Sequence, residues 1–136
     1  MNLLAPLYRL ADWLRWRVER NTGRAGEDRA HRWLRSHGFI VAARNWRPPQ
    51  GGGEIDIVAW EGEELVFVEV KTLTSGATSA PERAIGDDKI AALRRAARDY
   101  LRRCGATPLN VRFDVVSVCG DRLEHLRDAF AGDVSV

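Results

Sequence analysis

The chain has 136 residues, enough for one domain whose core buries most of its apolar surface. With 21 basic and 19 acidic side chains, the net charge is only +2, so overall charge does not indicate a nucleic-acid-binding protein. Cys104 and Cys119 stand far apart and match no metal-ligand spacing. They favour two reduced thiols in a cytoplasmic protein over a disulfide framework or a zinc site.

The first 22 residues predict an amphipathic helical extension, followed by one α/β domain over residues 23–136. Leucines recur at helical spacing from Leu3 to Leu14. The apolar run is interrupted by four charged side chains, Arg9, Asp12, Arg15 and Arg17. A membrane-spanning helix needs about 20 nearly uncharged residues, which excludes a transmembrane segment here. We expect the helix to dock on its own domain or on a second subunit, with a membrane surface as the alternative.

The elements predicted after this extension follow in the order helix, three strands, helix, strand. Their ranges are 24–37, 39–45, 54–60, 65–71, 81–103 and 111–118. A flexible segment covers 72–80, and residues 122–127 fit either a short strand or a helical turn. This order predicts an α/β fold with a mixed central β-sheet flanked by helices.

The two middle strands form a predicted hairpin with its turn at residues 61–64. The facing pairs are then Trp60 and Leu65, Val58 and Phe67, Asp56 and Glu69, and Glu54 and Lys71. The opposite face is wholly apolar and contains Ile55, Ile57, Ala59, Val66, Val68 and Val70. Because side chains alternate along a strand, one face is buried throughout and the other is half apolar, which favours helices on both sides.

Asp56 and Glu69 are expected to bring two carboxylates together beside apolar surface, since facing β-carbons lie about 5 Å apart. Such a pair needs a cation or a proton to offset the repulsion, and a divalent ion such as Mg²⁺ prefers carboxylate oxygens. Lys71 projects to the same side and could meet a phosphate oxygen or orient a water molecule. The alternative is a solvated sheet edge with a Glu54–Lys71 salt bridge, and a slip in register would separate the carboxylates.

Two ionisable residues, Glu27 and Lys89, fall on the apolar stripes of the two predicted helices. Ionisable groups at such positions are rare unless they are paired or functional. If both helices pack on the hairpin, these side chains approach the same ionisable patch; otherwise each snorkels to water. Asp114 is a weaker candidate, for which pairing with a neighbouring arginine is the favoured interpretation.

Several motifs together resemble the YraN family of uncharacterised bacterial proteins. They are Gly26-Glu27, Asn45-Trp-Arg47, Gly53-Glu-Ile-Asp56, Val66-Phe-Val-Glu-Val-Lys71, Lys89 and Arg112-Phe-Asp-Val-Val116. That family looks like a branch of the PD-(D/E)XK nuclease superfamily, near the archaeal Holliday-junction resolvases. The match runs from about Gly23 to Phe130 and implies a restriction-endonuclease-like core.

The resemblance implies a role for each matched residue. Asp56 and Glu69 correspond to the acidic pair that binds the metal, Mg²⁺ or Mn²⁺, and Glu27 corresponds to the helical glutamate that completes the site. Lys71 corresponds to the lysine of the nuclease motif, and Lys89 to a polar accessory residue. The sequence departs from the family where Thr72 and Leu73 follow Lys71, because an arginine is usual there.

The function expected from these residues is metal-dependent phosphodiester hydrolysis of DNA, including branched or repair intermediates. Contacts to DNA are predicted for the Gly-rich loop and for seven arginines: Arg44, Arg47, Arg94, Arg95, Arg98, Arg102 and Arg103. Trp46 could stack on a base. An ordinary solvated helix face is the alternative for the arginines. The rival functions are a non-catalytic nucleic-acid-binding or scaffold protein and an adaptor that docks through its N-terminal helix. By analogy with resolvases, the chain is expected to form a homodimer.

Overall fold

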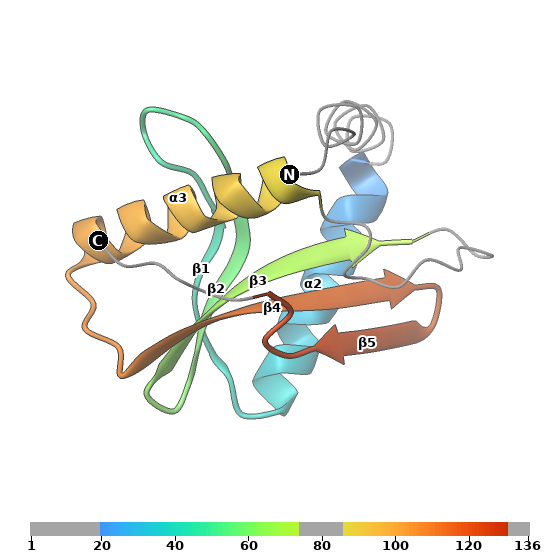
Figure 1. Cartoon of the computed structure of the whole chain (residues 1–136). Coiled ribbons are helices and arrows are strands. Elements are labelled where there is room, and N and C mark those ends of the chain that lie inside the picture. The colour runs from blue at the N-terminus through green and yellow to red at the C-terminus, as the bar shows by residue number, and fades with distance from the viewer. Residues whose placement is uncertain (1–19, 74–85, 131–136) are drawn as a thin grey trace.

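The computed structural model describes residues 20–73 and 86–130 as a five-stranded sheet with two helices (Figure 1). The elements are α2 (Arg20–Ser36), β1 (Ile40–Trp46), β2 (Ile55–Glu61), β3 (Glu64–Thr72), α3 (Asp87–Cys104), β4 (Asn110–Cys119) and β5 (Arg122–Leu126). The mixed α/β class is therefore confirmed. The C-terminal residues, for which the sequence allowed a short strand or a helical turn, form strand β5. Of the helical extension predicted over residues 1–22, residues 1–19 lie outside the described residues, and α2 begins at Arg20 and not at the predicted position 24.

Two further predicted boundaries need correction. The second helix begins at Asp87, because Gly86 before it is extended; residues 81–85 of the predicted helix lie outside the described residues. Thr72 belongs to β3 and not to the flexible segment, of which residues 74–80 are likewise outside the described part. Among the described helices, none is long and apolar enough to cross a membrane.

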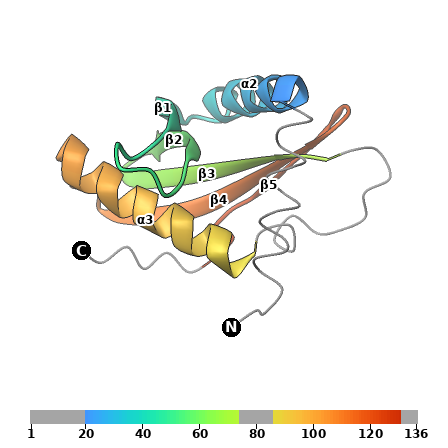
Figure 2. The same ribbon diagram turned by 90° about the horizontal axis from the view of Figure 1, so that it is seen from above.

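The strands follow one another in the sheet in the order β1-β2-β3-β4-β5. All neighbours are antiparallel except β3 and β4, which run parallel. Parallel neighbours need a crossover connection, and α3 lies in that connection. Seen from above, α2 and α3 cover opposite faces of the sheet (Figure 2).

Two apolar clusters fill the layers on either side of the sheet. On the α3 side, Leu93 and Tyr100 pack with Phe67 and Phe113. The α2 cluster contains Ala30, Leu34, Ile57, Val68 and Val116. Since both faces are covered, the expectation that the hairpin needs a helix on each side is confirmed.

The hairpin has the predicted register but a shorter turn. Trp60 pairs with Leu65 as expected, and Glu61 pairs with Glu64, so the turn consists of Gly62 and Glu63 alone. Gly62 has φ +60°, a left-handed conformation that favours glycine in tight hairpin turns. The register is unchanged because the turn is shorter by one residue on each side, so Trp60 still pairs with Leu65.

Beyond Ile57 and Val68 the paired ladder of β2 and β3 ends. The ladder therefore contains neither of the two predicted facing pairs, Asp56 with Glu69 and Glu54 with Lys71. Glu54 instead forms an ion pair of 2.8 Å with Arg47. Ile55 was predicted on the face of Ile57 but packs in the cluster on the α3 side. Both corrections have one cause: strict alternation across a hairpin holds only while the strands remain paired.

Candidate functional site

Asp56 lies where β2 separates from β3. Its Oδ2 accepts a hydrogen bond of 2.8 Å from the backbone N–H of Val70. Burial, and then the neighbouring carboxylate of Glu69, raise the pKa of Asp56 well above its ordinary value, although the Val70 N–H opposes this. The carboxyl of Asp56 is therefore a group that gains strongly from a nearby positive charge.

Glu69 supplies the second carboxylate and is only 4% exposed. Its Oε1 lies 3.2 Å from Nζ of Lys89 and 4.0 Å from Nζ of Lys71. Its other oxygen, Oε2, is buried without a hydrogen-bond partner among the described residues. A buried acceptor of this kind is rare and calls for a ligand or water that satisfies it. The structure thus brings Glu69, Lys71 and Lys89 together, as the sequence predicts if α3 packs on the hairpin.

Helix α2 approaches the other side of this region through Gly26. A Cβ atom at position 26 would overlap the hydroxyl oxygen of Thr72, at the end of β3. With threonine at position 72, glycine at position 26 avoids this overlap. The contact places Glu27 near the open end of the hairpin, where its charge contributes to the raised pKa of Asp56.

Glu27 is held by residues of β1. Arg44 lies 3.6 Å from its carboxylate, and the side-chain amide of Asn45, with its nitrogen facing the acids, donates 3.0 Å hydrogen bonds to both Glu27 and Glu54. Burial, and next the charge of Glu54, raise the pKa of Glu27 despite these partners. Asn45 has φ +51°, a conformation that asparagine tolerates better than most residues. The sequence contains Asn45 in a motif, but its bridging role needs the three-dimensional contact.

A second glycine seats the loop between β1 and β2 against α3. Gly53 has φ +149°, and a Cβ there would lie 2.9 Å from the backbone oxygen of Ala92. Glu54 and Asp56 follow directly, so this contact fixes the entry into β2 from the α3 side. The carboxylate region therefore lies between two close contacts, that of Gly26 in α2 with β3 and that of Gly53 with α3.

Ser117 is a polar residue of this region that sequence reasoning missed. It pairs in parallel register with Lys71, which places the two side chains on one face of neighbouring strands. Ser117 is 4% exposed, and its hydroxyl has no hydrogen-bond partner in the described part of the chain. A serine between valines in β4 gives no signal by itself, because only the pairing of β3 with β4 brings it beside Lys71.

The predicted DNA contacts occupy different environments. Arg44 is paired with Asp28 at 2.7 Å as well as with Glu27, and Arg47 is paired with Glu54. Arg98 is partly exposed on α3, whereas Nε of Arg94 is buried. Arg44 and Arg47 thus organise the carboxylates, and α3 carries the arginine that is available to a ligand.

Trp46 and Asp114 have structural contacts. The ring of Trp46 packs edge-to-face on Tyr100 with centroids 5.4 Å apart, so this partly buried tryptophan belongs to the core cluster. Asp114 is fully buried and forms a 2.8 Å ion pair with Arg112, as its favoured interpretation predicts.

The carboxylates fit a hard divalent cation in chemistry. Glu69 offers an unsatisfied buried oxygen, and Asp56 has a carboxyl whose ionisation is opposed by burial and by Glu69. Within the described residues, however, no three side chains of the usual ligand types are arranged to hold a metal, and Glu27 is engaged by Arg44 and Asn45. The geometry therefore does not supply the three-carboxylate set predicted from the sequence. Mg²⁺ commonly binds through one or two carboxylates and completes its coordination with water and substrate phosphates.

The part of the chain that contains this site matches a known protein family. A model of the uncharacterised protein family UPF0102 matches residues 26–118. The chain belongs to the UPF0102 family. A UPF0102 protein of Solibacter usitatus is 51% identical over 94% of this chain and 100% of its own length. UPF0102 proteins of Anaeromyxobacter dehalogenans and Shewanella amazonensis are each 44% identical, over 82% and 81% of this chain and 84% and 99% of their own lengths.

The UPF0102 match confirms the resemblance to the YraN family. It begins at Gly26, the residue at the close contact with β3, and ends at Val118, one residue after Ser117. All five of the predicted site residues, Glu27, Asp56, Glu69, Lys71 and Lys89, lie within it. UPF0102 is an uncharacterised family, and its name gives no activity.

Proposed function

We propose that this UPF0102 protein is a metal-dependent phosphodiester hydrolase that acts on DNA in the cytoplasm. The observation that carries the proposal is Oε2 of Glu69, which is buried beside Asp56 and has no hydrogen-bond partner in the described ranges, with two lysines near the other oxygen of Glu69. The site thus combines carboxylates that can bind a cation with lysine amines that can bind a phosphate. The restriction-endonuclease-like core implied by the YraN resemblance, and a homodimer that presents two such sites, belong to the same proposal.

In this proposal Asp56 and Glu69 hold Mg²⁺ or Mn²⁺. The bound cation supplies Lewis acidity and positive charge at the scissile phosphate. Lys71 positions the attacking water and stabilises the negative charge that develops on the phosphate oxygens. Lys89 fixes the orientation of the Glu69 carboxylate through its 3.2 Å ion pair. A new phosphorus–oxygen bond to water forms as the bond to one sugar oxygen breaks, so no covalent enzyme intermediate is required.

A non-catalytic nucleic-acid-binding protein is the second candidate. It is favoured by the same two lysines, because their charges already offset that of Glu69. It is favoured also by the lack of a three-ligand metal set among the described residues. In that case the carboxylates and lysines stabilise the fold, and binding resides elsewhere on the surface.

Cleavage of labelled linear and four-way-junction DNA with Mg²⁺ or Mn²⁺ distinguishes the two candidates. The wild type is compared with Asp56→Ala and Lys71→Ala, after unfolding curves establish that both variants fold. We expect cutting by the wild type and a loss of at least about 100-fold in each variant, the scale of removing a group that stabilises the transition state. Binding without cutting by all three proteins would establish the second candidate. Equal cutting by all three would remove Asp56 and Lys71 from the reaction.

A further inference from the structure

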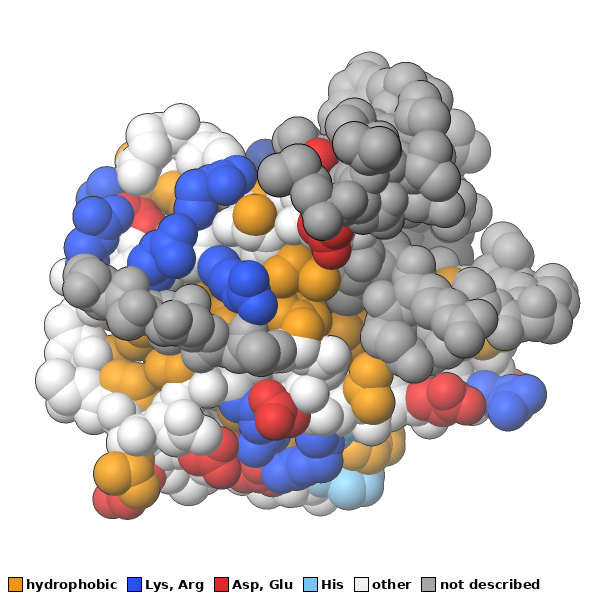
Figure 3. All heavy atoms as spheres, viewed as in Figure 1, with side chains coloured by type: hydrophobic (Ala, Val, Ile, Leu, Met, Phe, Trp, Pro, Cys, Tyr) orange, Lys and Arg blue, Asp and Glu red, His pale blue; other side chains and the backbone are white. Residues whose placement is uncertain are grey.

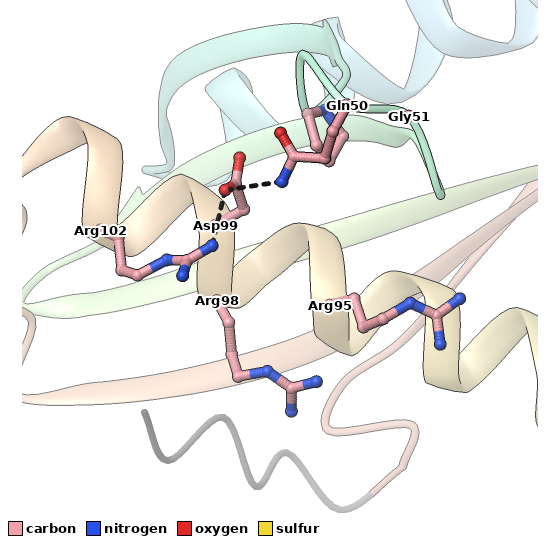
Figure 4. A pocket seen from close by; sticks show the side chains of 7 residues that line it. Gln50, Gly51, Arg95, Arg98, Asp99 and Arg102 are labelled. Atoms are coloured by element: carbon pink, nitrogen blue, oxygen red, sulfur yellow. Dashed lines mark hydrogen bonds and ion pairs between the residues drawn. The ribbon is translucent and has the colours of Figure 1, made fainter.

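A groove of about 420 Å³ lies between α3 and the loop that joins β1 to β2. Pro48, Gln50 and Gly51 form the loop side (Figure 4). The α3 side consists of Arg95, Arg98, Asp99 and Arg102. In Figure 3, basic side chains gather over α3 on the same face of the molecule. The groove is separate from the carboxylates, which adjoin the beginning of this helix through Lys89.

Asp99 builds one wall of the groove. It is 3% exposed, and its two carboxylate oxygens lie 2.8 Å from nitrogens of Arg102 and Arg103. The side-chain amide of Gln50 donates a 3.3 Å hydrogen bond to the same carboxylate. Asp99 therefore ties the loop to the helix and orients two guanidinium groups, while its single negative charge leaves the groove strongly positive.

Arg95 and Arg98 differ from the other arginines discussed above. Arg95 is exposed and Arg98 partly exposed, and neither forms an ion pair or hydrogen bond within the described part of the chain. In Figure 4 their guanidinium groups extend from α3, and no dashed line joins them to another of the residues drawn. Two cations without an ion pair among the described residues, next to a built, positively charged wall, form a ready site for anionic oxygens.

The spacing of these arginines suits a polymer of phosphates. Arg95, Arg98 and Arg102 lie at helical intervals of three and four residues, which places them on one side of α3. From Arg95 to Arg102 the helix rises about 10 Å, at about 1.5 Å per residue. Along the axis of a DNA duplex each strand carries one phosphate charge per about 3.4 Å, so a row parallel to that axis spans about three nucleotides.

We propose that this groove binds the phosphate backbone of a nucleic-acid strand, with Arg95, Arg98 and Arg102 as its phosphate contacts. The inference deepens the proposed function and rests on it for the identity of the polymer. The strand runs along α3 from the carboxylates toward Arg102. Because Lys89 precedes Arg95 by six residues, or about 9 Å of helix, the first contact lies about three nucleotides from the scissile phosphate.

The test is binding of fluorescent single-stranded and duplex DNA to the full chain in EDTA, which removes divalent metal and separates binding from cleavage. Arg95→Ala/Arg98→Ala is compared with Arg32→Ala/Arg35→Ala, which removes the same charge from exposed positions of α2, on the opposite sheet face. We expect the α3 pair to weaken binding about tenfold or more and the α2 pair to have little effect. The slope of log K against log salt should fall by about 1.8 for duplex or about 1.4 for a single strand.

Equal losses in the two double variants would overturn the groove, because they would indicate only a loss of net charge. A wild type that binds no DNA at low salt would also overturn it, together with DNA as the substrate of the proposed function. Undiminished DNA binding and cleavage by Arg95→Ala/Arg98→Ala would reject the groove and leave the hydrolase proposal standing. Tighter binding of an acidic protein than of DNA would assign the groove to a different class of partner.

Discussion

Oδ2 of Asp56 accepts a hydrogen bond of 2.8 Å from the backbone N–H of Val70 at the place where β2 and β3 stop pairing. A side-chain oxygen thus bonds a backbone donor where the strand ladder has ended. The sheet opens at this point, so Glu27 from α2 and Lys89 from α3 both influence the same carboxylate, although the helices cover opposite faces.

Replacing Asp56 by asparagine should stabilise the protein at neutral pH. The folded-state pKa of Asp56 is raised, so the stability that comes from its protonated form is present below its ordinary pKa and is lost as pH rises through the folded value. Asparagine cannot ionise, so the substitution removes the cost of ionising a buried carboxyl beside Glu69. We expect a gain of about 1–3 kcal/mol at pH 7.5, the scale of the desolvation penalty of a buried polar group.

Urea unfolding at pH 7.5 and pH 4 measures this effect. The advantage of Asp56→Asn should shrink at the lower pH, whereas Asp121→Asn, at an exposed carboxylate, should change stability little at either pH. A variant less stable than the wild type at pH 7.5 would contradict the assigned environment of Asp56.

Divalent cations should raise the melting temperature of the wild type if Asp56 and Glu69 hold a metal. A ligand that binds only the folded state adds about 2.7 kcal/mol of stability at one hundred times its dissociation constant. Calorimetry with and without Mg²⁺ or Mn²⁺ should show this rise in the wild type and its loss in Glu69→Gln. An equal rise in both proteins would place the cation elsewhere.

The contact between Gly26 and Thr72 predicts a compensating pair of substitutions. Gly26→Ala alone should destabilise the protein by about 1–3 kcal/mol, because its methyl group overlaps the Thr72 hydroxyl. Combined with Thr72→Ala, the same change should be tolerated, since the overlapping oxygen is gone and alanine favours the helix by about 1 kcal/mol. Free energies of unfolding for the single and double variants give the coupling. Additive effects would show that α2 can shift away from β3.

Asp114 should make folding stability sensitive to acid. Burial alone would raise its pKa, but hydrogen bonds from His125, Arg112 and the backbone N–H of Asp128 outweigh burial and hold the pKa below its ordinary value. The resulting stability is present above the ordinary pKa and is lost as pH falls through the lower folded value.

Asp114→Asn should cost about 3 kcal/mol at pH 7, because it leaves the buried guanidinium of Arg112 without its closest counter-charge. Chemical denaturation from pH 7 to pH 2 should show the difference closing at the acid end. Glu124→Gln, which breaks the exposed 3.8 Å pair with Arg122, is the matched control and should cost less than about 1 kcal/mol. A difference independent of pH would reject the ionic role of Asp114.

Much of the hairpin and its two covered faces could be predicted because local alternation is strong. Val58 and Phe67 are opposite each other as expected, since their register follows from the turn and from burial of the apolar positions. The stripe positions of Glu27 and Lys89 likewise predict that both approach the ionisable patch, and Lys89 contacts Glu69. Both positions could be predicted because helical periodicity is visible in a segment of only a few helical turns.

The carboxylate neighbourhood could not be predicted in full. Glu54 is drawn to Arg47 and Asn45, whereas simple hairpin alternation assigns it to Lys71. Ser117 reaches the face of Lys71 only because β4 runs parallel to β3. These contacts join residues whose separation along the chain gives no periodic signal.

The sequence by itself therefore determined the types of the elements before residue 120, the hairpin register, the family and most of the candidate residues, because each follows from local pattern and motif spacing. The tertiary structure alone decided where β2 leaves β3 and, within the described residues, which oxygen of Glu69 has no hydrogen-bond partner and which arginines on α3 form no ion pair. Those features depend on contacts between charged groups that are far apart in the sequence, and only the packing of the folded chain brings these groups together.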